Sequence, residues 1–332
     1  MNKKSSLHWL IAAMLGALAT GASAQAAYRV VELPTLPVAP GTNESYAMAM
    51  NAKGKVVVYV RDAASGNSQG EVCKPSVCTV VQPGGAAQYK AINKLGVLAG
   101  TAFYTGNQWW AVRNNGTVLE KIVAGFAYGI NSASVTVGKT SYEKPFRFDT
   151  TLTMLPTLGG RTGTAKAIND SGVIVGYAEL PDGQRHATQW VDSVAKDLGV
   201  LAGGTTSRAH GVNGAGQAVG CSDKALDTQM HAVKFRAGTV VEYTGALTSC
   251  AYSINKHGVA VGDMETEEHP TSHVFITDGR KLVALHSRLS EADRAKYDLM
   301  WPNGINDAGQ IAVTALRLAD SVIVALRLDP LP

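Results

Sequence analysis

The sequence predicts an all-β fold, a seven-bladed β-propeller of four-stranded repeats, each about 40 residues long, closed by an N-terminal strand. Three observations lead to this prediction: the composition, a motif that recurs seven times, and two chain ends that complement each other. Of the 332 residues, 45% are hydrophobic, 17% are charged and 35 are glycine. This composition favours many short strands joined by tight turns over long amphipathic helices.

Residues 1–24 are typical of a secretory signal peptide. Lys3 and Lys4 form the basic region, Leu10 to Leu18 lie in a short apolar region, and the small residues Ala22 and Ala24 precede the expected cut. No second apolar span follows in the sequence. We therefore expect an exported protein, periplasmic or extracellular, with no membrane span after cleavage.

Residues 25–332 are expected to form a single propeller domain. Without Lys3 and Lys4 the chain carries 28 basic and 26 acidic residues, a formal net charge of +2. A charge so nearly balanced argues against nucleic acid or an anionic membrane surface as the partner.

Four cysteines lie in the exported part, and an even number in an oxidising compartment favours two disulfides. Cys73 and Cys78 bracket a proline in a compact loop, and Cys221 and Cys250 are expected to pair by elimination. Neither spacing is that of a zinc knuckle, so we predict no metal at these cysteines.

The strongest signal is the string apolar-Asn-x-x-Gly, which recurs at intervals of 42, 38, 38, 44, 42 and 51 residues. Its asparagines are Asn51, Asn93, Asn131, Asn169, Asn213, Asn255 and Asn306. The asparagine can bond to its own backbone two residues on, and the glycine supplies a positive φ that closes a hairpin. Ser134 replaces this glycine in the third copy.

Each copy predicts four short strands. A small-apolar strand leads into the asparagine, and a second strand ends in glycine, as in "VIVG". A variable loop leads to a third strand such as "HAVKF", and a tight turn leads to the fourth. The second glycine is replaced by Val58 and Val313 in the first and last copies, and atypical terminal repeats are expected.

The two ends of the repeat region complement each other. Tyr28 to Leu33 resembles a fourth strand without its blade, whereas the last copy has room for only three strands, ending near Ser321 to Leu328. We expect these segments to pair, which would remove exposed sheet edges. An unclosed β-solenoid is the alternative. Ser290 followed by Asp293 predicts a short helix in the long insertion before Asn306.

These residues resemble the HAF-type extracellular repeat family, named for a His-Ala-Phe string in its third strand. The third strands in this chain begin with His186-Ala187, His231-Ala232 and His273-Val274-Phe275, and "LPTLGG" and "LGVLAGG" look like the family's connectors. The resemblance spans about residues 28–328. It implies an exported β-propeller-like protein and no settled activity.

The remaining candidate metal ligands are explained by the structure of the repeat and its loops. The three histidines recur once per repeat, so we interpret them as part of the repeat and not as ligands of one metal ion. The acidic stretch at Glu265, Glu267, Glu268 and His269 could bind calcium, but it lacks the spacing of a dedicated loop, and a solvated loop is favoured. No cofactor motif is present in the sequence.

A candidate ligand site follows from aligning the first strands on their asparagines. Two residues earlier stand only small residues: Ala49, Ala91, Gly129, Ala167, Gly211, Ser253 and Gly304. One residue further back stand larger, mostly polar residues: Met48, Lys90, Tyr128, Lys166, His210, Tyr252 and Asn303. We expect them to ring the channel mouth on the variable-loop face, with Arg208 and Trp301 nearby, and to suit an anionic or hydroxyl-rich ligand. The alternative is that strand ends near water simply tolerate polar residues.

These features favour a non-catalytic, monomeric platform that binds a protein, peptide or glycan. Two alternatives stay open. A carbohydrate-active enzyme would need facing carboxylates, and none stand at matching repeat positions in the sequence. A self-assembling surface or matrix protein would form concentration-dependent oligomers.

Overall fold

The computed structural model describes residues 27–39, 43–82, 87–104, 106, 108–236, 238–268 and 273–332. The predicted signal peptide and its cleavage site at Ala24 lie outside the described residues, as does His269. No helix among the described residues is long and apolar enough to cross a membrane.

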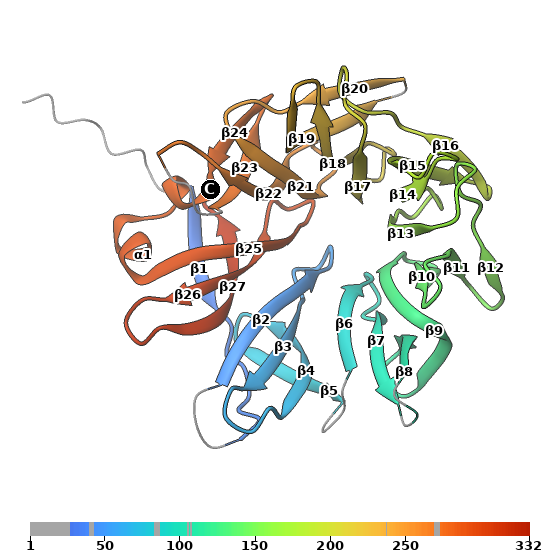
Figure 1. Cartoon of the computed structure of the whole chain (residues 1–332). Helices are drawn as coiled ribbons and strands as arrows, with labels where there is room; N and C mark the ends of the chain where they lie inside the picture. The colour runs from blue at the N-terminus through green and yellow to red at the C-terminus, as the bar shows by residue number, and fades with distance from the viewer. Residues whose placement is uncertain are drawn as a thin grey trace, which may run out of the picture.

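The described strands form six antiparallel sheets that follow one another around a central axis (Figure 1). The first sheet contains β2 (Asn43–Met50), β3 (Val56–Asp62), β4 (Ser68–Lys74) and β5 (Val77–Gln82). The second contains β6 (Ala87–Ile92), β7 (Leu98–Tyr104), β8 (Gln108–Asn114), β9 (Leu119–Ile130), β10 (Thr136–Thr140), β11 (Pro145–Phe148) and β12 (Leu152–Met154). The third contains β13 (Gly163–Ile168), β14 (Ile174–Glu179), β15 (Arg185–Val191) and β16 (Val194–Asp197).

The other three sheets have four strands each. The fourth contains β17 (Ser207–Val212), β18 (Ala218–Lys224), β19 (Asp227–Arg236) and β20 (Thr239–Glu242). The fifth contains β21 (Thr248–Ile254), β22 (Ala260–Glu265), β23 (His273–Asp278) and β24 (Lys281–Ala284). The last contains β25 (Tyr297–Ile305), β26 (Ile311–Arg317), β27 (Val322–Pro330) and, at its edge, β1 (Tyr28–Glu32).

The seven-stranded second sheet differs from the predicted set of separate four-stranded sheets. The cause is β9, which pairs with β8 through Leu119 to Ala124 and with β10 through Gly125 to Ile130. Gly125 has φ of 145°, and a Cβ there would lie 2.2 Å from the carbonyl oxygen of Lys139. The chain thus passes from the second repeat into the third at a glycine within one strand, without a connecting loop.

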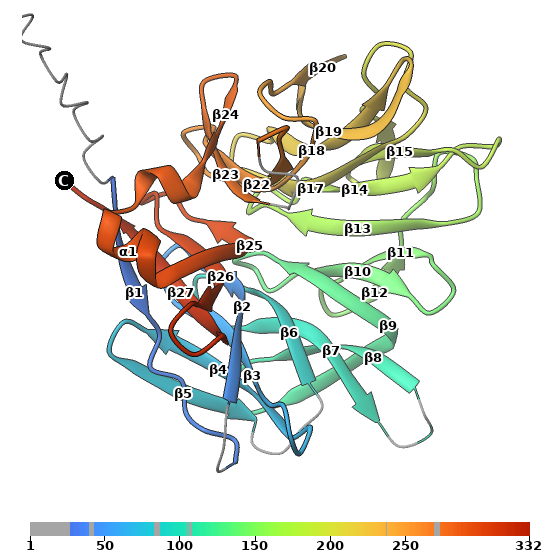
Figure 2. The ribbon, with the colours of Figure 1, turned by 60° about the vertical axis from the view of Figure 1, so that its left-hand side comes forward.

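The predicted pairing of the two chain ends is confirmed. β1 lies antiparallel to β27, with Tyr28 opposite Pro330 and Glu32 opposite Leu326, and Figure 2 shows the two strands side by side. Tyr297 donates its hydroxyl proton to the Glu32 carboxylate at 2.6 Å, and Arg317 forms an ion pair with the same carboxylate. The last sheet is therefore assembled from both ends of the described chain.

The core is divided into apolar clusters that each join one repeat to the next. Val175 and Ala187 pack with Ala209 and Val233 in one cluster, and equivalent clusters follow around the molecule. The long insertion forms a 3-10 helix, η1 (Leu285–Arg288), and the predicted helix, α1 (Glu291–Lys296), whose N-cap Ser290 accepts a hydrogen bond from the Asp293 N–H at 3.1 Å.

Candidate functional site

The seven repeat asparagines form the predicted turns. In each copy the side-chain oxygen accepts from the backbone N–H groups two and four residues later, as Asn169 does from Ser171 at 3.0 Å and Val173 at 2.9 Å. The glycines three residues on have positive φ, and Ser134 adopts the same conformation with φ of 63°. The turn geometry is therefore kept even where the glycine is lost.

The same asparagines also bond to the neighbouring repeat, an interaction that the turn motif did not predict. Each side-chain amide donates to the backbone carbonyl of the next repeat's asparagine, at 3.0 to 3.4 Å, and the Asn306 amide donates to Asn51. All seven side chains are buried. The sequence carried one signal for this role, because the asparagine is kept in every copy, including the copy that lacks the glycine.

A cavity of about 310 Å³ lies on the axis beside the circle that the seven repeat asparagines form. Its wall is formed by the asparagines and by the apolar residues that precede them, Met50, Ile92, Ile130, Ile168, Val212, Ile254 and Ile305. Lys94, Ser132, Asp170 and Asp307 also line it, so the axis has both apolar and polar side chains at the end where the first strands finish.

The first strands of neighbouring repeats contact one another all the way round, from β2 through β6, β9, β13, β17 and β21 to β25 and back to β2. The small residues two positions before the asparagines permit this approach. A Cβ on Gly129 would lie 3.1 Å from the Ala167 Cα, and a Cβ on Gly211 would lie 3.1 Å from the Ser253 Cα. The expectation of a crowded innermost strand is confirmed.

Every first strand carries a β-bulge at the predicted candidate position. The register with the second strand skips one residue there, for example between Ala165 and Ala167. The skipped residues, which we call the bulge ring, are Met48, Lys90, Tyr128, Lys166, His210, Tyr252 and Asn303. A bulge leaves one residue unpaired and re-aims its side chain.

The second glycine of the repeat is explained by this bulge. Gly176 lies opposite Ala165, and a Cβ on Gly176 would lie 1.9 Å from the carbonyl oxygen of Thr164. The backbone of the bulged strand therefore packs directly against Gly176, which leaves no room for a side chain at that position.

Members of the bulge ring in adjacent repeats touch each other. The Lys166 Nζ lies 4.1 Å from the centre of the Tyr128 ring, and His210 meets Tyr252 edge to face at 5.3 Å. Tyr252 also donates to Asp263 at 3.0 Å. The structure therefore brings Tyr128, Lys166, His210 and Tyr252 together in two neighbouring pairs.

The cations of this region are close enough to disturb one another. Burial lowers the pKa of Lys166 to about 8, assisted by the positive charges of Lys139, Arg208 and Lys90. Burial also lowers the pKa of Lys90 and, together with Lys166 and Arg208, holds the pKa of His210 well below its usual value. His210 is therefore neutral at pH 7, whereas the lysines and arginine form a cationic cluster.

Glu143 partly compensates this cationic cluster, because it pairs with Lys139 and its charge also acts on Lys166. Lys139 is paired with Glu143, but the side chains of Lys90, Lys166 and Arg208 form no hydrogen bond or ion pair with any described residue. Arg208 is exposed and lies 5.5 Å from the centre of the Tyr177 ring. A half-buried ammonium group without a partner is unfavourable unless something outside the chain binds it.

The other two predicted site residues lie in the last repeat. Trp301 is 44% exposed and stacks on Tyr46 of the first repeat, with ring centres 6.5 Å apart and an interplanar angle of 23°. The Asn303 amide donates to the Trp301 carbonyl at 3.1 Å. These residues therefore belong to the β25 and β2 side of the ring, away from Lys166.

Both predicted disulfides are present. Cys221–Cys250 joins β18 to β21 across two neighbouring sheets, with Cα atoms 4.8 Å apart, and the Cys221 sulfur lies 4.0 Å from His210 Nε2. Cys73–Cys78 joins β4 to β5 within one sheet. Oxidised sulfurs are not thiolate ligands, so neither cluster of His or Glu with cysteine is a metal site in this state.

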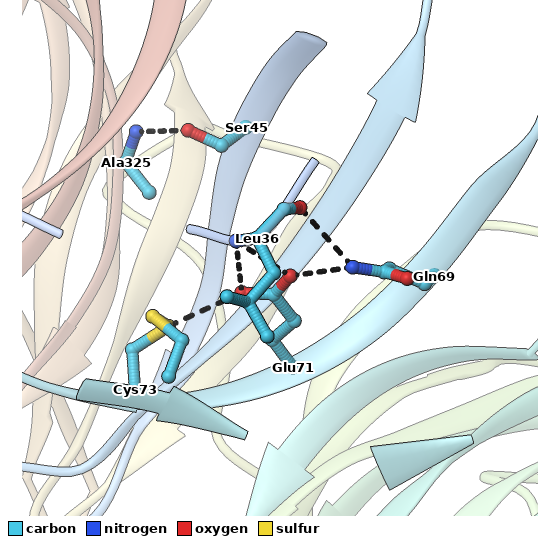
Figure 3. The surroundings of a disulfide bond; sticks show 7 residues. Leu36, Ser45, Gln69, Glu71, Cys73 and Ala325 are labelled. Atoms are coloured by element: carbon cyan, nitrogen blue, oxygen red, sulfur yellow. Dashed lines mark hydrogen bonds between the residues drawn. A yellow bond between two sulfur atoms is a disulfide. The ribbon is translucent and has the colours of Figure 1, made fainter. Parts of the chain in front are cut away.

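Glu71 beside the first disulfide is a buried acid that sequence reasoning missed. Its carboxylate accepts from Gln69 Nε2 at 2.7 Å and from the Leu36 N–H at 3.0 Å, and Figure 3 shows these contacts beside Cys73. Burial raises the pKa of this carboxyl. The group fastens the segment after β1 to β4, a structural role that no local motif could signal.

The third-strand histidines pair within their own sheets. His186 Nδ1 lies 2.8 Å from Asp197, and His231 lies between Asp227 at 2.9 Å and Glu242 at 3.1 Å. His273 begins β23 at the equivalent place. The interpretation of these residues as part of the repeat fits this arrangement. Glu267 and Glu268 are exposed, as expected of a solvated loop.

No family model matches the chain, and no curated protein matches it. Among solved structures, the β-propeller domain of the Trilobed protease from Pyrococcus furiosus, described as having an open velcro topology, is similar with a TM-score of 0.58. It is 12% identical, and the match covers 87% of this chain and 98% of that chain.

Two weaker likenesses are to a putative TolB from Agrobacterium tumefaciens and to the SapL1 lectin in complex with alpha methyl fucoside. Their TM-scores are 0.43 and 0.42, with 8% and 11% identity. The matches cover 88% and 73% of this chain and 100% and 95% of those chains. The likeness to the protease domain shows that this chain has a β-propeller fold.

Proposed function

We propose that this protein is an exported, non-catalytic binding platform that takes an anionic ligand at the bulge ring. The carrying observation is the set of three cations, Lys90, Lys166 and Arg208, whose side chains have no hydrogen-bond or ion-pair partner among the described residues. An anion near Lys166 would offset the repulsion from the other two cations and raise the pKa of its ammonium group, which burial and these cations lower.

The platform is proposed to have seven blades. β9 then serves as the outer strand of the second blade and the inner strand of the third, so the seven-stranded sheet counts as two blades. The circle of seven asparagines, one from each repeat, supports this count.

Export is supported by the two disulfides, because such bonds persist in oxidising compartments. The signal peptide at residues 1–24 and membership of the HAF-type extracellular repeat family remain part of the proposal. We further propose that residues 25–332 act as a single monomeric domain.

The test is a screen of labelled glycans and peptides against the mature chain, repeated with a triple variant in which Lys166, His210 and Tyr252 are replaced by alanine. Ligands of the bulge ring should lose binding in the triple variant while its unfolding midpoint shows an intact fold. Lys256→Ala, on the exposed residue after Asn255 at the asparagine end, is the matched control and should bind normally. Unchanged binding by the intact triple variant would place the ligand elsewhere.

A further inference from the structure

Two chemically different groups of side chains lie in and beside the bulge ring. Because the first strands contact one another in chain order, the fourth and fifth repeats lie across the axis from the last and first repeats, and the second repeat lies beside the first. The second, fourth and fifth repeats carry the cations Lys90, Lys166 and Arg208, which we call the cationic arc. The last and first repeats carry Trp301, Asn303 and Tyr46, which we call the aromatic arc.

The aromatic arc offers a flat apolar surface with hydrogen-bonding groups around it. Register irregularities on both sides of Trp301 interrupt the pairing of β25, and its side chain is 44% exposed although it stacks on Tyr46. Tyr46 donates to Glu44 at 2.7 Å, and Asn303 lies within 3.4 Å of the Thr314 hydroxyl. Amphipathic rings with polar neighbours suit a ligand that has one apolar face and several hydroxyl groups.

The two arcs together discriminate between classes of anion. A polyphosphate or nucleic acid requires positive charge along its whole length, but the carboxylate of Asp263 stands beside Tyr252 and that of Glu44 beside Tyr46. A neutral sugar would leave the cations of the cationic arc unpaired. An acidic sugar chain combines a carboxylate with hydroxyls and an apolar ring face, and therefore matches both arcs.

We infer that the ligand is an acidic oligosaccharide of the uronate type, with a carboxylate on the cationic arc and a sugar ring stacked on Trp301. This inference rests on the proposed function and adds the class of ligand. Tyr128, against which Lys166 packs, and the neutral His210 would contact the hydroxyl groups near the carboxylate.

The test is calorimetric titration of the mature chain with an oligogalacturonate, an oligoguluronate, the methyl ester of the oligogalacturonate, and tripolyphosphate. At least one of the free acids should bind, with affinity that falls as salt is raised. The ester, which has the same sugar rings without charge, should bind at least about tenfold more weakly. Equal binding of acid and ester would overturn the inference, and so would the absence of binding by both acids.

Four variants assign the two arcs. Lys166→Gln and Arg208→Gln should each weaken binding of the acid about tenfold, whereas Lys166→Arg should largely retain it. Trp301→Ala should weaken binding of the acidic oligosaccharide and leave any residual tripolyphosphate binding unchanged. Trp109→Ala, a change at an exposed tryptophan in another sheet, is the control and should have no effect. Unaltered affinity in Trp301→Ala would overturn the stacking role.

The outcome also separates this inference from the proposed function. If an acidic peptide or tripolyphosphate binds more tightly than both uronates, and the alanine triple variant abolishes that binding, the ring is an anion site but its ligand is not a uronate. If no probe depends on the ring, both proposals fail.

Discussion

Asparagine serves two purposes in each repeat because its amide carries an acceptor and donors on one flat group. The oxygen holds the turn of its own repeat, and the nitrogen reaches the backbone of the next. Aspartate could provide only the first interaction, and serine could provide neither with the same reach. The recurrence of asparagine in all seven copies thus has a physical cause.

Asn169→Asp should isolate the contact between repeats. The carboxylate can still accept from Ser171 and Val173, but it has no proton to donate to the Asn213 carbonyl, which keeps its bond from the Gly216 N–H and loses the bond between repeats. We expect a loss of about 1–3 kcal/mol in the free energy of unfolding, and a larger loss for Asn169→Ala. Chemical denaturation measures both. Asn115→Ala, at an exposed turn asparagine, is the control and should change stability far less. Equal stabilities of Asn169→Asp and the unaltered protein would show that the bond contributes nothing.

Lys166 is expected to favour binding at the expense of stability. Its pKa is about 8 in the folded state and 10.5 ordinarily, so between these pH values the unfolded chain binds more protons than the folded chain. Stability should therefore rise as pH increases from 8 to 10.5, and the full penalty of the buried charge is present below pH 8.

Lys166→Gln should consequently stabilise the protein at pH 7, by on the order of 1–3 kcal/mol, and remove this part of the pH dependence. Unfolding midpoints of both proteins between pH 7 and 10 measure the effect. A variant that is less stable at pH 7 would contradict it. The gain in stability together with weaker anion binding would be typical of a functional group.

At the scale of the element, the bulge takes one residue of each first strand out of register with the second strand. In the middle repeats Gly176 and its equivalents lie opposite the bulge, whereas Val58 and Val313 occupy that position in the first and last repeats. Repeat alignment could predict which residues occupy the bulge because the spacing to the asparagine is constant. It could not predict that Lys166 packs on Tyr128, since that contact depends on the distance between adjacent repeats.

The two disulfides are expected to differ in what they contribute. Cys221–Cys250 spans 29 positions and ties two sheets together, whereas Cys73–Cys78 spans five within one hairpin. The loop-entropy model gives about 3–4 kcal/mol for the first and about 2 kcal/mol for the second. Thermal unfolding of the two Cys→Ser double variants tests this order. A larger effect from losing Cys73–Cys78 would mean that its contacts with Glu71 outweigh loop entropy.

The whole molecule depends on strand β1, which comes from the other end of the chain than its sheet partners. Deleting residues 27–33 would uncover the edge of β27 and remove the partner of Tyr297 and Arg317. We expect a loss of stability well beyond the share of seven residues, together with edge-to-edge association. Unfolding midpoints and size-exclusion chromatography measure these effects. Glu32→Gln, which keeps the strand, should remain monomeric, and a monomeric deletion variant with an unchanged midpoint would contradict the role of β1.

The closing strand and both disulfides could be predicted because each leaves a local trace in the sequence: an orphan strand, an even cysteine count and a compact loop. The division into sheets could not be predicted fully. The spacing from Asn93 to Asn131 is 38 residues, the same as from Asn131 to Asn169, where residues 155–162 connect two sheets, so spacing could not reveal that β9 runs through the bend at Gly125 without a connector. The buried position of Glu71 could not be predicted because its partners Leu36 and Gln69 come from outside any repeat motif.

The position of the two ends has a topological consequence. Ala27 accepts a hydrogen bond from the Leu331 N–H at 2.9 Å, so the described chain ends where it starts. A peptide linker there and new termini at the exposed turn of Asp182 and Gly183 would give a circular permutant with the same contacts. The third sheet would then be assembled from both termini, as the last sheet is now. The order of repeats along the gene is in this sense arbitrary, and only their cyclic order is fixed by the fold.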